Sequence, residues 1–215
     1  MKKKIAFVHN AMWEMYNFRG ELLQELKAKG YEITVICPPD EKNAHYFTDL
    51  GIKLLTVPMS RKGTNIKEDV QLVKNLFKVY KKEKFDLVFH YTIKPNIYGT
   101  LAAKLAGIKS IAITTGLGYV FLHNNITSLI AKFMYKFSLA FANEVWFLND
   151  DDMNIFLDKD LITERQAFKL PSEGINTKRF VHKEKNRKDS KTVFLMIARV
   201  LYDKGFNEYL EAAKL

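Results

Sequence analysis

Two cationic side chains, Arg199 and Lys204, lie where a predicted strand passes into a predicted helix, five residues apart. Arginine presents a planar fork of N–H donors and lysine a compact positive charge. Phosphate groups bind readily beside helix N-termini, and two such cations can straddle a diphosphate. This junction is therefore a candidate diphosphate site.

A second candidate is the segment between a predicted strand at 5–9 and a predicted helix at 18–29. It has no Gly-x-Gly-x-x-Gly and is rich in bulky aromatic residues, which disfavours a dinucleotide site. Arg19 lies close to the expected helix start, where a positive charge opposes the helix dipole. Either Arg19 and the helix hold a phosphate or carboxylate together, or Arg19 pairs with Glu14, Glu21 or water.

A third candidate is the loop 114–119, which follows a predicted strand and contains Gly116 and Gly118. Two glycines allow the backbone to turn tightly and to present N–H groups to a ligand. The alternative is a plain turn between a strand and a helix.

The sequence shows no constellation for a metal ion or a nucleophile. Its five histidines are scattered, and none has ligand spacing with cysteine or carboxylates. Cys37, within the apolar run 33–37, is interpreted as a small buried hydrophobe rather than a nucleophile. The acidic run 150–152 is interpreted as the first turn of a helix, where carboxylates suit the dipole.

Short apolar runs alternate with amphipathic stretches along the chain. Strands are predicted at 5–9, 33–37, 53–57, 86–90, 110–114, 144–148 and 167–170. Helices are predicted at 18–29, 41–50, 66–80, 95–106, 126–142 and 150–157, with Asn65 as the N-cap of the third. Strands separated by crossover helices pair in parallel, which predicts an α/β fold with a Rossmann-like, doubly wound sheet. Ligands then bind outside the carboxyl ends of the strands, in the loops 9–19, 60–65, 90–96 and 114–121.

The predicted helix at 126–142 has an unusually regular apolar stripe, flanked by Lys132 and Lys136. A stripe at this spacing is typical of a core-facing helix, and we interpret it as core. The alternative is a helix that lies on a membrane surface.

The composition changes after the last of these strands. Residues 1–171 are interpreted as one domain, and the basic, weakly apolar stretch 172–191 as a crossing segment and linker. A strand is expected at 192–198, followed by a helix from about residue 204. One strand and one helix cannot bury a core, so we expect 192–215 to be the start of a second, truncated Rossmann-like domain.

The chain has 34 Lys and Arg against 24 Asp and Glu, a net charge of +10. Such an excess indicates an anionic partner: nucleic acid, a phosphorylated small molecule or an acidic membrane. Dispersed basic residues and the lack of a recognition motif disfavour nucleic acid. The single cysteine favours a reducing compartment. The N-terminal apolar run is too short for a secretory signal, and no run is long enough to span a membrane. We therefore expect a cytoplasmic protein, or one at the inner face of the cytoplasmic membrane.

Four segments together resemble family 4 glycosyltransferases of the GT-B fold. They are 16–19, 115–118, the crossing segment 171–180 and the Arg-x-x-x-x-Lys-Gly junction within 197–205. The similarity extends over the whole chain. It is greatest to bacterial retaining enzymes that build capsule, O-antigen or N-glycan sugars on a polyprenyl-diphosphate carrier.

The resemblance implies a division of labour. The first domain would receive a lipid-linked saccharide acceptor at the membrane surface, and the second would bind a nucleotide-sugar donor, expected to be UDP-linked. Arg199 and Lys204 match the pair that holds the donor diphosphate and stabilises the leaving group, with no metal required. The cleft and acceptor contacts would be Asn17, Arg19, Thr115, Gly116 and Gly118.

The sequence departs from the family pattern at two places. Where many members have a histidine after the fifth strand, this chain has Thr114, Thr115 and Gly116. The paired glutamates of the donor domain would lie beyond residue 215, so the chain alone is expected to be inactive. Two other functions remain open: a non-catalytic domain that binds the acceptor or an anionic membrane, and a nucleotide-sugar epimerase of similar fold.

Overall fold

The protein is described from a computed structural model of residues 1–215. The structure describes residues 2–60, 65–117, 121, 126–171, 173–182, 192–198, 200 and 202–214. The chain divides into two compact units, Met1–Glu173 and Gly174–Leu215.

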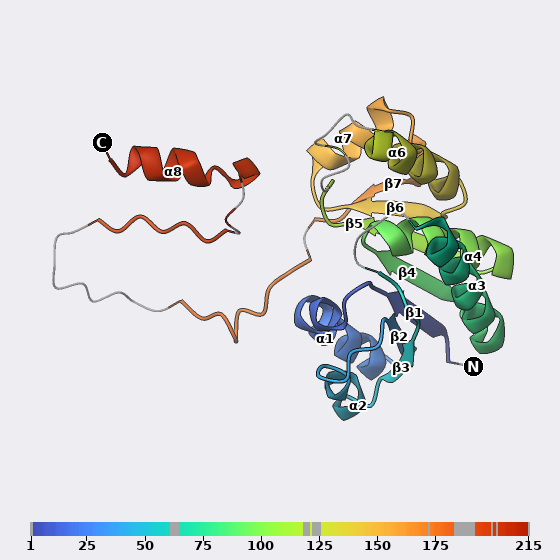
Figure 1. Ribbon diagram of the computed structural model, residues 1–215. Helices are drawn as coiled ribbons and strands as arrows, with labels where there is room; N and C mark the ends of the chain where they lie inside the picture. The colour runs from blue at the N-terminus through green and yellow to red at the C-terminus, as the bar shows by residue number, and fades with distance from the viewer. Residues whose placement is uncertain are drawn as a thin grey trace. The chain divides into compact units, whose positions relative to one another are not determined.

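The described residues of the first unit form a parallel sheet of seven strands in the order β3-β2-β1-β4-β5-β6-β7 (Figure 1). The strands are β1 Lys4–Val8, β2 Glu32–Cys37, β3 Lys53–Thr56, β4 Leu87–Tyr91, β5 Lys109–Thr114, β6 Glu144–Phe147 and β7 Ala167–Lys169. The chain first builds outward from β1 to β3 and then returns to β4 on the other side of β1. The crevice at a parallel sheet's carboxyl edge opens at such a reversal. The α/β, Rossmann-like prediction is confirmed.

Helices cover both faces of the sheet, which explains why its strands are continuously apolar. In β1, Phe7 packs in the same cluster as α1 (Met12–Ala28) and α2 (His45–Asp49). Its neighbour Val8 packs with α3 (Ile66–Glu83) and α4 (Thr100–Ala106). Figure 1 shows α1 and α2 together, and α3 and α4 together elsewhere on the sheet. A third cluster joins β5 and β6 to α6 (Ile126–Leu139) and α7 (Asp150–Asp158).

Helices α3 and α7 both begin at an asparagine cap, of which the one at Asn65 was predicted. The Asn65 side chain accepts a hydrogen bond from the backbone N–H of Lys67 at 3.1 Å, at the start of α3. The Asn149 side chain accepts one from the N–H of Asp152 at 2.7 Å, at the start of α7. The acidic run 150–152 is therefore the first turn of a helix, as predicted.

The start of α1 differs from the prediction. The helix begins at Met12, not near residue 18, because the buried side chains of Met12 and Met15 lie on the same face as Leu23 further along. Most of the expected first loop is therefore helix, and only residues 9–11 connect β1 to α1.

The outward face of α6 also differs from the prediction. Its buried side chains include Tyr135 and Leu139, whereas most of the apolar stripe predicted to be core is exposed, including Phe133 and Phe137. The spacing of the apolar residues predicted a helix with a wide apolar stripe. Periodicity alone does not determine which side of the helix packs against the sheet.

A buried polar pair links β4 to the helices on one face. His90 is fully buried, and its Nε2 lies 2.9 Å from the Tyr80 hydroxyl of α3. A Cβ at Gly99, in the π-helical turn η1 (Pro95–Gly99), would lie 2.5 Å from His90 Cδ2. Glycine there is what lets η1 approach β4. Burial lowers the pKa of His90 from 6.5 to about 3.

We predict a pH dependence of stability from this imidazole. Between pH 6.5 and about 3 the unfolded chain binds a proton there and the folded chain does not, so stability is lost as the pH falls. Going from pH 7 to pH 5 should lower the free energy of unfolding by about 2 kcal/mol. In urea unfolding, His90→Gln should flatten this slope by that amount, while His45→Gln, which removes an exposed imidazole, should not. An unchanged slope in His90→Gln would contradict the assignment.

In the second unit, residues 174–182 include an exposed turn, and the further described elements are a 3₁₀ turn, η3 (Tyr202–Lys204), and α8 (Phe206–Ala212). The described residues 192–197 form no strand, which contradicts the prediction. The reason is physical: a strand needs a neighbouring strand to accept and donate its backbone hydrogen bonds. The apolar side chains of this segment, among them Phe194 and Ile197, are exposed.

Candidate functional site

The sheet reverses between β1 and β4, and polar side chains gather where these two strands end. His9 follows β1, and its Nδ1 accepts a hydrogen bond at 2.9 Å from the N–H of Ala11. Its Nε2 lies 3.8 Å from the carboxylate of Glu14 in the first turn of α1. The ring of Tyr91, the last residue of β4, lies 6.1 Å from the His9 ring. These residues form one wall of the candidate site.

Arg19 joins this cluster, but not as a helix N-terminal residue. It lies in the second turn of α1, so the expected contribution of the helix dipole is wrong. The guanidinium stacks 4.8 Å from the centre of the Tyr91 ring. It pairs with Glu173 after β7, and its Nη1 donates to the carbonyl of Phe18 at 3.0 Å. The ion-pair partner of Arg19 is therefore Glu173, and not Glu14 or Glu21 as the alternative prediction had it.

The Arg19–Glu173 pair joins α1 to the crossing segment within the first unit. The Arg19 side chain is 8% exposed, so the pair is largely shielded from water on the arginine side. Burial raises the pKa of Tyr91 to about 12, and the neighbouring charge of Arg19 acts in the opposite direction. Tyr91 is therefore a neutral hydrogen-bonding group at physiological pH.

Thr92, the next residue, has a strained backbone. Its φ of 71° is in the left-handed region, which β-branched residues rarely adopt. Its hydroxyl is buried and has no hydrogen-bond partner among the described residues. Strained residues persist where the surrounding fold holds them, and they concentrate at functional sites. A strained residue at the sheet reversal thus marks the same edge as the Arg19 cluster.

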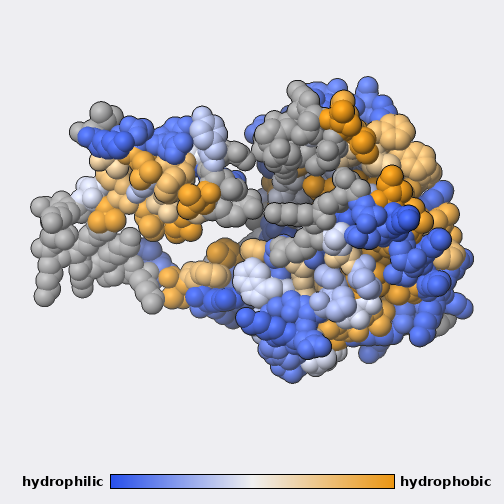
Figure 2. All heavy atoms as spheres, viewed as in Figure 1, coloured by the Kyte–Doolittle hydropathy of each residue, from blue (hydrophilic) through white to orange (hydrophobic). Residues whose placement is uncertain are grey.

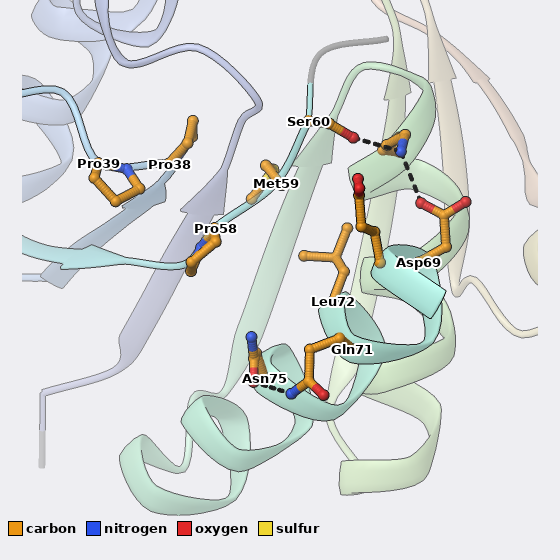
Figure 3. Close-up of a pocket in the computed structure, with 11 residues that line it drawn as sticks. Pro38, Pro39, Pro58, Met59, Ser60, Asp69, Gln71, Leu72 and Asn75 are labelled. Atoms are coloured by element: carbon orange, nitrogen blue, oxygen red, sulfur yellow. Dashed lines mark hydrogen bonds and ion pairs between the residues drawn. The ribbon is translucent and has the colours of Figure 1, made fainter. Parts of the chain in front are cut away.

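A buried ion pair lies next along this edge. Lys94 Nζ is 2.7 Å from Asp69 Oδ1 in the first turns of α3 and 2.8 Å from the Ser60 hydroxyl after β3. The Tyr98 hydroxyl donates to the other Asp69 oxygen at 2.8 Å. Both charged side chains are 10% exposed. Figure 3 shows Asp69 and Ser60 directed toward the same ammonium group.

The ion pair lines a groove beyond the ends of β2 and β3 (Figure 3). This pocket has a volume of about 470 Å³, with walls that are mostly apolar and a few amides and carboxylates. An adjoining pocket of about 320 Å³ reaches the first turn of α1. The two share Pro38, Pro39 and Met59, so a shallow, mixed-polarity surface runs along the carboxyl edge. An apolar lining with a few polar groups is typical of small-molecule binding sites.

The remaining candidates lie in different places. Thr115 and Gly116 follow β5 at the same edge and are exposed, and Gly116 has a φ of 136° that favours glycine. Asn17 is half-buried on α1. Lys204 is exposed at the end of η3 in the second unit. Gly118 and Arg199 lie outside the described residues.

Other reactive groups do not add a site. Cys37 is buried at the end of β2, and burial raises the pKa of its thiol to about 12, so it is a packing residue, as predicted. Among the residues that the structure describes, no three His, Cys, Asp or Glu side chains are grouped to share a metal ion.

The family described as "Glycosyl transferase 4-like" matches residues 4–149, which include the whole edge from β1 to β6. The chain belongs to this glycosyltransferase family. The match covers His9, Arg19, Lys94 and Gly116 but ends before Glu173 and the second unit.

Two curated relatives extend the similarity. An N,N'-diacetylbacillosaminyl-diphospho-undecaprenol α-1,3-N-acetylgalactosaminyltransferase from Campylobacter jejuni is 31% identical over 99% of this chain. A UDP-Gal:α-D-GlcNAc-diphosphoundecaprenol α-1,3-galactosyltransferase from Escherichia coli is 25% identical over 86% of it. The alignments span 60% and 50% of the lengths of these relatives.

Solved structures confirm the fold. A glycosyltransferase from Rickettsia africae aligns with a TM-score of 0.60 at 19% identity, covering 84% of this chain and 45% of that one. A UDP-N-acetylglucosamine 2-epimerase aligns with the same TM-score of 0.60 at 18% identity, covering 78% of this chain and 48% of that one. Shape alone does not separate transferase from epimerase; the family match does.

Sequence reasoning missed four residues at this edge: Tyr91, Lys94, Asp69 and Glu173. Lys94 lies in the loop 90–96 that was expected to face a ligand, so a cation directly after a buried strand was an available signal. No signal in the sequence indicated the pairing of Lys94 with Asp69, because these two residues are 25 positions apart.

Proposed function

We propose that this chain forms the acceptor-side part of a glycosyltransferase. The enzyme transfers a sugar from a UDP-linked donor to a saccharide carried on a polyprenyl diphosphate, in the synthesis of a cell-surface polysaccharide or glycan. The observation that carries the proposal is the family match over the site edge, together with two curated relatives whose names specify diphospho-undecaprenol acceptors.

The acceptor is proposed to bind along the carboxyl edge of the first unit. Arg19, Tyr91 and Lys94 bring two cations and a phenol to this edge, each already held by protein partners. Side chains that their ion pairs already hold in one geometry lose little freedom when a ligand binds at this edge. Asn17 and the loop with Thr115, Gly116 and Gly118 are proposed to contact the sugar.

The donor is proposed to bind the second unit, with Arg199 and Lys204 holding its diphosphate and stabilising the leaving group without a metal ion. A leaving nucleoside diphosphate gains negative charge in the transition state, and fixed cations stabilise it most at that point. The described part of this unit offers one short helix and an exposed apolar segment. We therefore propose that residues 1–215 alone bind the acceptor but do not transfer a sugar to it.

We also propose that the protein works at the inner face of the cytoplasmic membrane as a peripheral protein. The net charge of +10 favours an anionic lipid surface. Among the described residues, no helix has both the length and the hydropathy to cross a bilayer.

A sugar-transfer assay tests the proposal. The 215-residue chain and the Campylobacter relative are each given radiolabelled UDP-N-acetylgalactosamine or UDP-galactose with an undecaprenyl-diphosphate-linked saccharide. The relative should label the lipid. The chain alone should bind the lipid-linked saccharide in a filter assay without labelling it. If the chain labels the lipid, the proposal that residues 1–215 alone are inactive is wrong, but sugar transfer is supported. If the chain does not bind the lipid-linked saccharide, the acceptor assignment is contradicted. Conversion of the UDP-sugar to its epimer without acceptor would establish the rival activity.

A further inference from the structure

Helix α6 carries large apolar side chains on its outward side as well as on its inward side. Its inward side includes two buried serines, Ser128 and Ser138, beside Tyr135 and Leu139. Its outward side carries large apolar residues with high exposure: Ile126 at 76%, Leu129 at 61%, Ile130 at 55%, Phe133 at 68% and Phe137 at 51%. A helix that only packs on its own sheet would carry mainly polar side chains on its outward side.

The exposed residues form one continuous stripe, here called the α6 face. At about 100° per residue, the positions 126, 129, 130, 133 and 137 fall within a sector of about 100°, over a length of about 16 Å. Phe141 extends the stripe, with its ring 5.6 Å from that of Phe137. Leu105 is also exposed, on α4, a helix that contacts α6. Figure 2 shows hydrophobic residues gathered on the surface over α6, with hydrophilic ones beside them.

Lysines border the α6 face, and α6 itself contains no carboxylate. Lys132 and Lys136 lie one turn apart on the flank of the stripe. Lys104 of α4 lies with its Nζ 5.5 Å from the centre of the Phe141 ring. Protein–protein interfaces are depleted in lysine, whereas an apolar helix face with lysine on its rim is typical of helices that lie in the headgroup region of a bilayer.

We infer that the α6 face docks onto an anionic lipid bilayer. The apolar side chains enter the boundary between headgroups and acyl chains, and Lys104, Lys132 and Lys136 contact the lipid phosphates. This inference rests on the proposed function and deepens it, because it names the surface that brings the carboxyl edge of the sheet to a lipid-linked acceptor.

The test is vesicle sedimentation of the 215-residue chain with phosphatidylglycerol–phosphatidylcholine vesicles and with pure phosphatidylcholine vesicles. The chain should bind the anionic vesicles at low salt and much less at high salt. Phe133→Ser/Phe137→Ser should lower the partition coefficient by about 10-fold or more. Lys132→Gln/Lys136→Gln should lower it by about 10-fold on anionic vesicles and little on neutral ones.

The matched control is Ile66→Ser/Val70→Ser, which removes two exposed apolar side chains from α3, a helix that is also basic. This variant should sediment like the unchanged protein, and far-UV circular dichroism should show that all variants are folded. The inference would be overturned if the unchanged chain did not bind anionic vesicles. It would also be overturned if Ile66→Ser/Val70→Ser lost as much vesicle binding as Phe133→Ser/Phe137→Ser. Self-association that Phe133→Ser/Phe137→Ser abolishes, without any vesicle binding, would overturn it too and would assign the α6 face to a second copy of the chain.

Failure here is separable from failure of the proposed function. Binding of a short-chain, water-soluble diphosphate-linked saccharide requires the carboxyl edge but no vesicle. If that binding persists while vesicle binding is absent, only the lipid-docking inference is overturned. If vesicles bind and the saccharide does not, the acceptor assignment alone is wrong.

Discussion

Replacing Lys94 by methionine is expected to lower the free energy of unfolding by about 3–5 kcal/mol. The change leaves the Asp69 carboxylate, which is 10% exposed, without the cation that lies 2.7 Å away. The Tyr98 hydroxyl still donates to this carboxylate, but one neutral hydrogen bond does not replace a buried ion pair. Urea unfolding followed by circular dichroism measures the loss.

Two further variants show whether the pair itself is responsible. Lys74→Met removes an exposed lysine from the same helix as Asp69 and should change stability by less than about 0.5 kcal/mol. Asp69→Asn/Lys94→Met should be more stable than the sum of the single changes predicts, by about 1–3 kcal/mol. Strict additivity would mean that Lys94 and Asp69 do not interact in the folded protein.

The second large effect concerns the donor side. In a chimera that joins residues 1–215 to the C-terminal part of the Campylobacter relative, Arg199→Ala and Lys204→Ala should each slow sugar transfer by about 10²-fold or more. Each change removes a positive charge proposed to stabilise the leaving diphosphate in the transition state. Initial rates of label transfer at saturating acceptor provide the measurement.

The control for this pair is Lys214→Ala, because Lys214 pairs with Glu211 on the surface at the end of α8. It should transfer sugar at the rate of the unchanged chimera. Rates for Arg199→Ala and Lys204→Ala within a few-fold of that value would remove the diphosphate assignment.

Local pattern was enough to predict the sheet. In β1 and β4 the continuous apolar runs reflect burial on both faces, and the helices between strands require parallel pairing. Asn65 marked a helix start because its side chain caps free backbone N–H groups, and the acidic run 150–152 marked the first turn of another helix.

Features that depend on tertiary contacts were not predictable. The early start of α1 depends on Met12 and Met15 packing against the sheet. Arg19 was assigned to a ligand or a near neighbour, whereas its partner Glu173 is 154 residues away. The stripe of α6 was detected, but its direction depends on which side of the helix contacts β5 and β6.

The central claim is that the carboxyl edge of the first unit binds a diphosphate-linked saccharide, and hydrogen–deuterium exchange tests it most directly. With a short-chain, water-soluble acceptor, amides at 9–11, 91–94 and 115–117 should exchange more slowly. Those at the opposite edge, 29–31, 84–86 and 107–109, should not change. Protection confined to the opposite edge, or none at saturating acceptor, would contradict the account.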